Sequence, residues 1–195
     1  ELCNPGALDS TAVSGKIVLC KRGAIARVDK GFAVYLAGGA GMILYNQNDG
    51  QSQVTDTHWV PSVHINNTDG LVIKDYIANS SSPVAQINGG EKTTVDAPNM
   101  AAFSSRGPNR LSADIIKPDI TAPGVQILAG NSPFPDPGNV PGELFQAIAG
   151  TSMSSPHIAG VFALIKQAHP DWSPAIAKSA IMTSAYQDVN KEDGV

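Results

Sequence analysis

The chain has 195 residues, of which 42% are hydrophobic and 15% are charged, a composition that can bury a core and excludes an intrinsically disordered protein. Its formal net charge of −4, with no basic stripe in the sequence, argues against a nucleic-acid partner, and its apolar runs are far shorter than the ~20 residues of a membrane span. The 19 glycines and 14 prolines favour a compact, turn-rich fold over a long helical bundle.

The first part of the chain is expected to alternate strands and helices. Residues 15–20 and 41–46 are short apolar runs next to glycine, which is typical of buried strands. Between them, residues 25–37 place apolar side chains at helical spacing, and two glycines follow. We therefore predict a strand–helix–strand unit with parallel strands, and an α/β fold.

Further strands and a helix are predicted before the turn-rich second part of the chain. Residues 60–65 and 84–87 resemble strands, and a helix is expected through 70–78. The segment 88–99, rich in glycine and polar residues, is the best candidate boundary between two lobes. The residues that offer an N-cap for the helix are Asn67, Thr68 and Asp69.

The second part of the chain contains more turn signals and two predicted helices. A loop dense in proline and glycine spans residues 131–142. Residues 158–165 are apolar nearly all round, as in a central buried helix. The next helix is expected to run from Ser173, as its N-cap, to about Ala185.

Two cysteines and two glycosylation signals bear on the compartment. Cys3 and Cys20 either form a disulfide that closes a loop of about 18 residues or remain two free, half-buried thiols. Their spacing fits no zinc pattern, so we expect neither a metal site nor a cofactor. A disulfide favours an oxidising compartment, and the acceptor tripeptides that begin at Asn66 and Asn79 add weak support for a secreted, extracellular glycoprotein.

Ser152 has the local setting of a nucleophile. Gly150 is expected to permit a strained turn before a helix, with Pro156 in the first helical turn. At a helix start, free backbone N–H groups and the positive end of the helix dipole favour an anion, such as the oxyanion formed when a serine attacks a carbonyl. The alternative is that Ser152 only caps a buried helix.

The string over residues 150–160, Gly-Thr-Ser-Met-Ser-Ser-Pro-His-Ile-Ala-Gly, closely resembles the nucleophile motif of the subtilisin-like serine peptidases, peptidase family S8. Three further segments resemble companion motifs of that family in the same order: residues 103–108, 117–125 and 169–174. Their sequences are most similar to those of the plant-type subtilases. The resemblance implies that Ser152 is the acylating nucleophile, that its backbone N–H is one donor of the oxyanion hole, and that the substrate is a polypeptide.

A second resemblance covers the N-terminal lobe. Residues 13–23 and 38–46 look like a protease-associated (PA) domain, which plant-type subtilases insert just before the segment matched here by 103–108. The resemblance implies a mixed α/β PA lobe over residues 1–92. It also implies that residues 93–195 are the C-terminal part of the parallel-sheet catalytic domain, with the nucleophile serine.

The rest of the catalytic machinery does not appear in the sequence. In this family the Asp and His of the triad, and the oxyanion-hole Asn, come earlier in the chain. His157 cannot replace that His, because it points about 140° away from Ser152 around a helix and is expected to be buried against a backbone group.

We therefore expect part of a longer protein, inactive alone, whose apolar helix needs the missing N-terminal part of the catalytic domain or a second copy. The alternative function is a protein-interaction module built on the PA domain, without catalysis.

Overall fold

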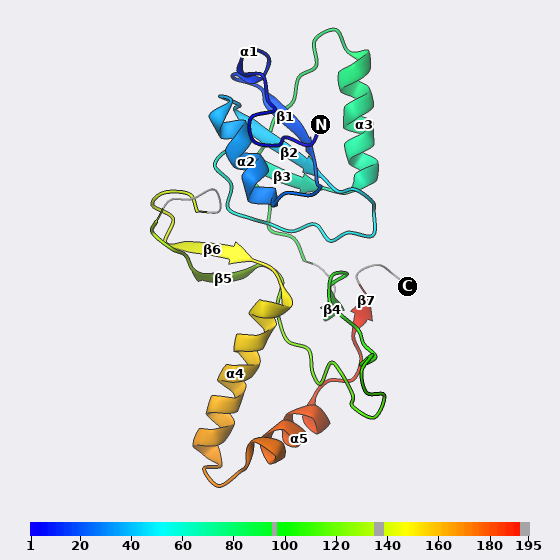
Figure 1. Cartoon of the computed structure of the whole chain (residues 1–195), viewed down its shortest axis with the longest axis vertical. Helices are drawn as coiled ribbons and strands as arrows, with labels where there is room; N and C mark the ends of the chain where they lie inside the picture. The colour runs from blue at the N-terminus through cyan, green and yellow to red at the C-terminus, as the bar shows by residue number, and fades with distance from the viewer. Residues whose placement is uncertain (95–96, 135–138, 192–195) are drawn as a thin grey trace. The chain divides into compact units, whose positions relative to one another are not determined.

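The computed structural model describes residues 1–94, 97–134 and 139–191 (Figure 1). The chain divides into two compact units. Unit 1 comprises Glu1–Thr94 and Leu128–Ile148, and unit 2 comprises Val95–Ile127 and Ala149–Val195. Residues 135–138 of the predicted proline- and glycine-rich loop lie outside the described residues.

Unit 1 is built on a three-stranded sheet. The strands β1 (Ile17–Lys21), β2 (Gly41–Tyr45) and β3 (Ser62–Ile65) lie in the order β1-β2-β3, and both pairs are parallel. All five residues of the central strand β2 are buried, as expected for a parallel strand covered on both faces. The predicted strand–helix–strand unit and the α/β class are confirmed.

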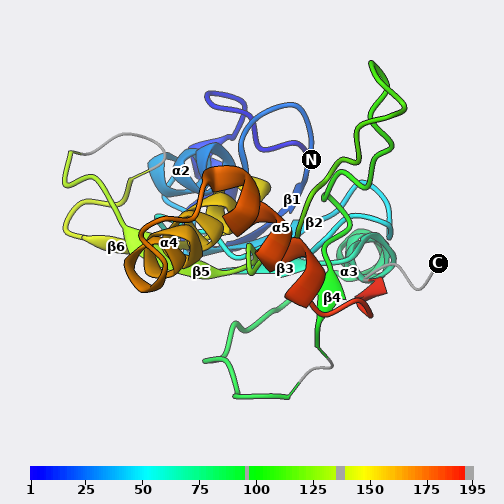
Figure 2. The same cartoon turned by 90° about the horizontal axis from the view of Figure 1, so that it is seen from below.

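Two helices cover this sheet on opposite faces. Alternate residues of β2 point to opposite sides. Met42 belongs to the buried cluster that contains Val34 of α2 (Arg27–Leu36), whereas Tyr45 lies against Gly70 of α3 (Asn67–Asn79). Figure 2 shows α2 and α3 on either side of the strands. A short helix that the sequence did not predict, α1 (Ser10–Val13), precedes β1.

Two details of the sequence prediction for unit 1 are wrong. The N-cap of α3 is Asn66, one residue before the predicted candidates, and its side chain accepts a hydrogen bond of 2.7 Å from Asp69 N. Residues 84–87 form no strand. The backbone of Val84 pairs with the Tyr76 hydroxyl, through its N–H at 3.0 Å and its C=O at 3.4 Å, instead of with a neighbouring strand.

Cys3 and Cys20 are joined by a disulfide bond. Both residues are buried in the core cluster, with 3% and 0% of their surface exposed. The bond fastens the N-terminal segment to β1, where Lys21 N also donates a hydrogen bond of 2.7 Å to Glu1 O.

Unit 2 contains two long helices and a small sheet. The helix α4 (Thr151–Ala168) is followed by α5 (Pro174–Ser184), and the predicted N-cap of α5 is confirmed because Ser173 Oγ accepts from Ile176 N at 3.3 Å. The strands β4 (Asn99–Met100) and β7 (Asn190–Lys191) pair in parallel. A further two-stranded sheet pairs β5 (Ile127–Gly130) with β6 (Phe145–Ile148), and apart from Ile127 its residues belong to unit 1.

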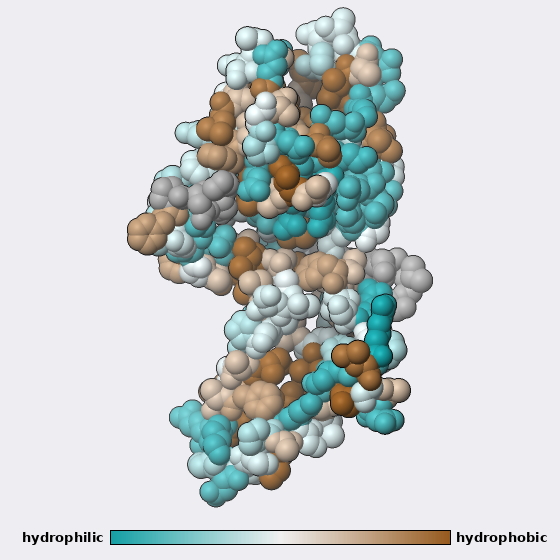
Figure 3. Space-filling model, in the orientation of Figure 1, coloured by the Kyte–Doolittle hydropathy of each residue, from teal (hydrophilic) through white to brown (hydrophobic). Residues whose placement is uncertain are grey.

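The expected burial of the apolar helix is wrong for this chain. No residue of α4 is buried, and Leu164 exposes 66% of its surface. The helix packs against α5, a single helix that leaves much of its circumference open. Figure 3 shows hydrophobic side chains on the surface of the molecule. Within the described residues, no helix is long and apolar enough to cross a membrane.

Candidate active site

Ser152 lies in the first turn of α4 and is exposed to solvent. The amide groups at the start of a helix have no partner within it, and the helix dipole adds partial positive charge there. The Ser152 hydroxyl makes no hydrogen bond to any residue that the structure describes. An exposed hydroxyl beside such amides can attack a carbonyl carbon while an amide N–H stabilises the resulting oxyanion.

The start of α4 is held by the segment before β5. Gly150 N donates to Gly124 O at 2.8 Å, and Ser154 Oγ donates to Ala122 O at 2.8 Å. A Cβ atom at Gly124 would lie 2.2 Å from Ser154 Oγ and 2.9 Å from Gly150 O. Only glycine therefore allows this close approach.

Gly124, Ala122 and Ser154 were not predicted as positioning residues. The segment 117–125 resembles a family motif and contains Ala122 and Gly124, but the motif does not indicate that this segment contacts the start of α4.

Two expectations about the local backbone are wrong. Gly150 has φ 165° and ψ 160°, an extended conformation that any residue adopts, so the turn is not strained there. Pro156 is the sixth residue of α4 and lies inside the helix, beyond its first turn. Because proline has no N–H, the carbonyl of Ser152 lacks its usual helical donor at residue 156.

The histidines of unit 2 are both engaged elsewhere. His157 is exposed, contrary to the expected burial, but its Nδ1 does pair with a backbone group, Met153 O, at 2.8 Å. His169 is the C-cap of α4 and stacks on Trp172 with ring centroids 4.1 Å apart. Neither side chain is a partner of the Ser152 hydroxyl.

Asp119 has a structural setting. It accepts a hydrogen bond from Lys117 and forms an ion pair of 2.7 Å with Lys178 of α5. The bond from Lys117, then that from Lys178, lowers the pKa of the Asp119 carboxyl. This carboxylate ties the segment after residue 116 to α5.

The other predicted site residues lie in unit 1. Asn66 is the N-cap of α3, and Asn79 is its last residue, exposed, with Nδ2 donating to Asp75 Oδ1 at 2.9 Å. Across the described ranges, no group of three or more His, Cys, Asp or Glu side chains is placed to hold a metal ion.

Comparison with known proteins identifies the family. The sequence model of the subtilase family, peptidase S8, matches residues 23–195. The chain belongs to the subtilase family. It is 49% identical over 203 residues to the subtilisin-like protease SBT1.4 of Arabidopsis thaliana, a match that covers all of this chain and 26% of that protein.

Other plant subtilases match in the same way. The identity is 48% over 196 residues to SBT1.3 of Arabidopsis thaliana and 44% over 197 residues to SBT5.4 of the same organism. These matches cover 95% and 97% of this chain. The subtilase segment described here spans about a quarter of the length of these relatives.

Proposed function

We propose that this chain carries the nucleophile segment of a secreted subtilisin-like serine endopeptidase, with Ser152 as the attacking residue. The observation that supports this assignment most strongly is the exposed Ser152 hydroxyl in the first turn of α4, within a chain of the subtilase family. The substrate is a polypeptide.

The reaction is acyl transfer through a covalent intermediate. Ser152 Oγ attacks the carbonyl carbon of the scissile peptide bond while a histidine outside this chain takes its proton. The backbone N–H of Ser152 donates to the tetrahedral oxyanion. The proton passes to the leaving amine as the C–N bond breaks, and water then hydrolyses the acyl-enzyme to free Ser152.

This chain alone is proposed to be inactive. In unit 2, His157 pairs with Met153 O and His169 stacks on Trp172, so neither is placed as the base of Ser152. The family places its triad Asp and His in earlier segments. Loss of the base in such a site lowers the rate by about 10⁴- to 10⁶-fold.

We further propose that residues 1–92 are the PA domain and residues 93–195 the C-terminal part of the catalytic domain. The compact packing of Glu1–Thr94 supports a boundary near residue 92, although Leu128–Ile148 groups with the same unit. The exposed apolar surface of α4 supports a partner that covers it, either the N-terminal part of the catalytic domain or a second copy.

Secretion and glycosylation are also proposals. The disulfide supports an oxidising compartment, and Asn66 and Asn79 are the glycan acceptors. The alternative function, a protein-interaction module without catalysis, is supported by the compact, disulfide-linked packing of unit 1.

A chimera tests the proposed function. This chain replaces the matching segment of SBT1.4, so that the rest of the relative supplies the remaining residues. We expect the chimera to cleave a casein substrate, Ser152→Ala to lower that activity about 10⁴-fold or more, and the isolated chain to be silent. The matched control is Ser155→Ala, which removes an exposed hydroxyl three residues further along α4 and leaves activity unchanged.

Two results contradict the proposal. If Ser152→Ala retains the activity of the parent chimera, Ser152 is not the nucleophile. If the chimera is folded and secreted but inactive whatever residue occupies position 152, the interaction module is the better account of this chain.

A further inference from the structure

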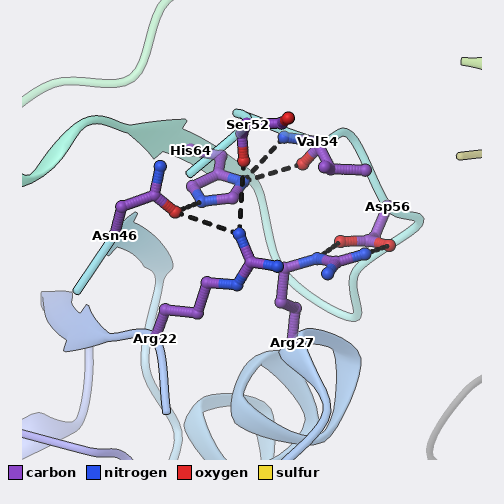
Figure 4. A network of polar contacts seen from close by, with 7 residues as sticks. All are labelled: Arg22, Arg27, Asn46, Ser52, Val54, Asp56 and His64. Carbon is purple, nitrogen blue, oxygen red and sulfur yellow. Dashed lines mark hydrogen bonds and ion pairs between the residues drawn. The ribbon is translucent and has the colours of Figure 1, made fainter. Parts of the chain in front are cut away.

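A polar cluster fastens a loop to the edge of the sheet in unit 1 (Figure 4). Arg22 follows β1, Asn46 follows β2, and His64 belongs to β3. The side chains of all three meet because parallel strands end at one edge of a sheet. Asn46 Oδ1 lies 2.8 Å from His64 Nε2 and accepts from Arg22 Nη1 at 3.2 Å.

The same cluster binds the loop between β2 and β3 through the backbone of Ser52 and Val54. Arg22 Nη1 donates to Ser52 O at 3.2 Å, and Val54 N donates to His64 Nδ1 at 3.0 Å. Ser52 and Val54 are buried, with 8% and 4% of their surface exposed. Asp56 is bound through both carboxylate oxygens by Arg27 of α2, at 2.5 and 2.9 Å.

The contact from Val54 N requires His64 to be unprotonated at Nδ1. Asn46 Nδ2 donates to Gln51 O at 2.7 Å, which fixes the amide so that its oxygen faces His64. The imidazole then carries its hydrogen on Nε2 and uses Nδ1 to accept from Val54 N. A proton added at Nδ1 removes that acceptor and must turn toward Val54 O, 2.9 Å away.

His58, unlike His64, has no acceptor in place for a proton added at Nδ1. Its Nδ1 is buried and has no hydrogen-bond partner among the residues described. The ring packs on α2, because a Cβ atom at Gly31 would lie 2.7 Å from that nitrogen. Protonation of His58 buries an N–H group without an acceptor.

The surrounding charges act on the two histidines in both directions. The groups that act on His64 are Arg22, Arg27 and Asp56, and those that act on His58 are Asp56, Arg27 and His64. Burial lowers the pKa of both histidines and is the largest cause. Arg27 lowers both further, whereas Asp56 raises both and the hydrogen bond with the Val54 backbone raises that of His64. The cluster thus holds two guanidinium groups and one carboxylate before any histidine is charged.

We propose that residues 52–58 form an acid-released strap, held on the sheet edge at neutral pH by neutral His58 and His64 and detached when these side chains take up protons. Proton binding to the two histidines therefore changes the equilibrium between a closed and an open loop between β2 and β3. The proposal concerns unit 1 alone and does not depend on the role of Ser152.

The sign of the pH dependence follows from linkage. In the open strap the histidines are solvated, with an ordinary pKa near 6.5. In the closed strap the pKa of each lies lower, so opening takes up protons once the pH falls below about 6.5. Between the two pKa values, each histidine raises the opening constant by up to about tenfold per pH unit. Above that window the opening constant does not depend on pH.

Hydrogen exchange of the 195-residue chain from pH 8 to pH 4.5, corrected for the intrinsic rate of each amide, tests the proposal. We expect the amides of residues 52–58, above all Val54 N, which donates to His64 Nδ1, to lose protection as the pH falls below about 6.5, while those of α3 stay protected. In His64→Gln, whose side-chain amide can still donate to Asn46, this pH dependence is reduced to the part that His58 contributes. Adding His58→Gln removes it.

The matched controls are the exposed histidines of unit 2. His157→Gln and His169→Gln are expected to leave the exchange of residues 52–58 unchanged. A flat wild-type profile from pH 8 to 4.5 overturns the proposal, as does a slope that survives in the double variant. If His64→Gln already lacks protection at pH 8, NMR titration of the wild-type rings decides, because an ordinary pKa at His64 also overturns the proposal.

Discussion

Gly124 is the residue on which the position of Ser152, the proposed nucleophile, depends most directly. It accepts from Gly150 N, and the space of its missing side chain is filled by Ser154 Oγ and Gly150 O. Any Cβ at this position displaces Gly150 and Ser154, which lie two positions before and after Ser152 in the chain.

We expect Gly124→Ala, made in the SBT1.4 chimera, to lower kcat/KM by about 10²-fold, because a displacement of the nucleophile by about 1 Å is enough for such a loss. The measurement is the cleavage rate beside a melting curve. The control is Gly130→Ala, where a Cβ meets nothing within 4 Å. Equal rates for Gly124→Ala and the parent, with both folded, are inconsistent with the positioning role.

At the scale of single residues, the sequence predicts Ser152 as the nucleophile but does not indicate which residues hold it in position. The serine lies within a contiguous string, which a single chain displays in full. The approach of Gly124 to Ser154 joins residues 30 positions apart in sequence and depends on backbone geometry, which no local pattern encodes. The sequence also misjudged Gly150, since its extended backbone needs no glycine.

The packing of α3 on the sheet depends on Gly70. A Cβ atom there would lie 2.3 to 2.4 Å from three atoms of the fully buried Tyr45 side chain. In an exposed helix, alanine in place of glycine stabilises by about 1 kcal/mol. Here the enforced shift of a buried ring, typically costing about 1–3 kcal/mol, outweighs that gain.

We therefore predict that Gly70→Ala lowers the free energy of unfolding of unit 1 by up to about 2 kcal/mol. Urea denaturation followed by Tyr and Trp fluorescence measures the change. Gly89→Ala, where a Cβ meets nothing within 4 Å, serves as the control and should be neutral. A stabilised Gly70→Ala protein would show that α3 does not pack on Tyr45 as described.

The elements that could be predicted are those with local signals. The apolar runs of β1 and β2 and the helical spacing of α2 lie within single segments. Residues 84–87 have the composition of a strand, but the Tyr76 hydroxyl takes the backbone groups of Val84. The two-residue strands β4 and β7 depend on a partner about 90 positions away, so no periodicity reveals them.

The Cys3–Cys20 disulfide is expected to stabilise unit 1. It closes a loop with a sequence separation of 17 residues, and in the chain-entropy model such a loop stabilises the folded state by about 3 kcal/mol. We expect reduction to lower the unfolding free energy of unit 1 by about that amount.

Urea denaturation with and without reductant checks this prediction, with the Cys3→Ser/Cys20→Ser protein as the reference that reductant leaves unchanged. If wild-type stability is the same in both conditions, the covalent link adds nothing to unit 1.

For the whole molecule, the sequence identified the family but not the surroundings of α4. A helix that is apolar nearly all round predicts burial, yet burial depends on what packs against it, and in this chain that is α5. The family motifs were sufficient because they are contiguous strings in a fixed order.

The central claim, that Ser152 is the attacking residue, is tested most directly by locating a covalent adduct. The SBT1.4 chimera is treated with a fluorophosphonate probe and digested, and tandem mass spectrometry identifies the modified residue. The account predicts one adduct, on Ser152 Oγ, that is absent from Ser152→Ala and present in Ser155→Ala. An adduct on any other serine of an active chimera, with Ser152 unmodified, contradicts it.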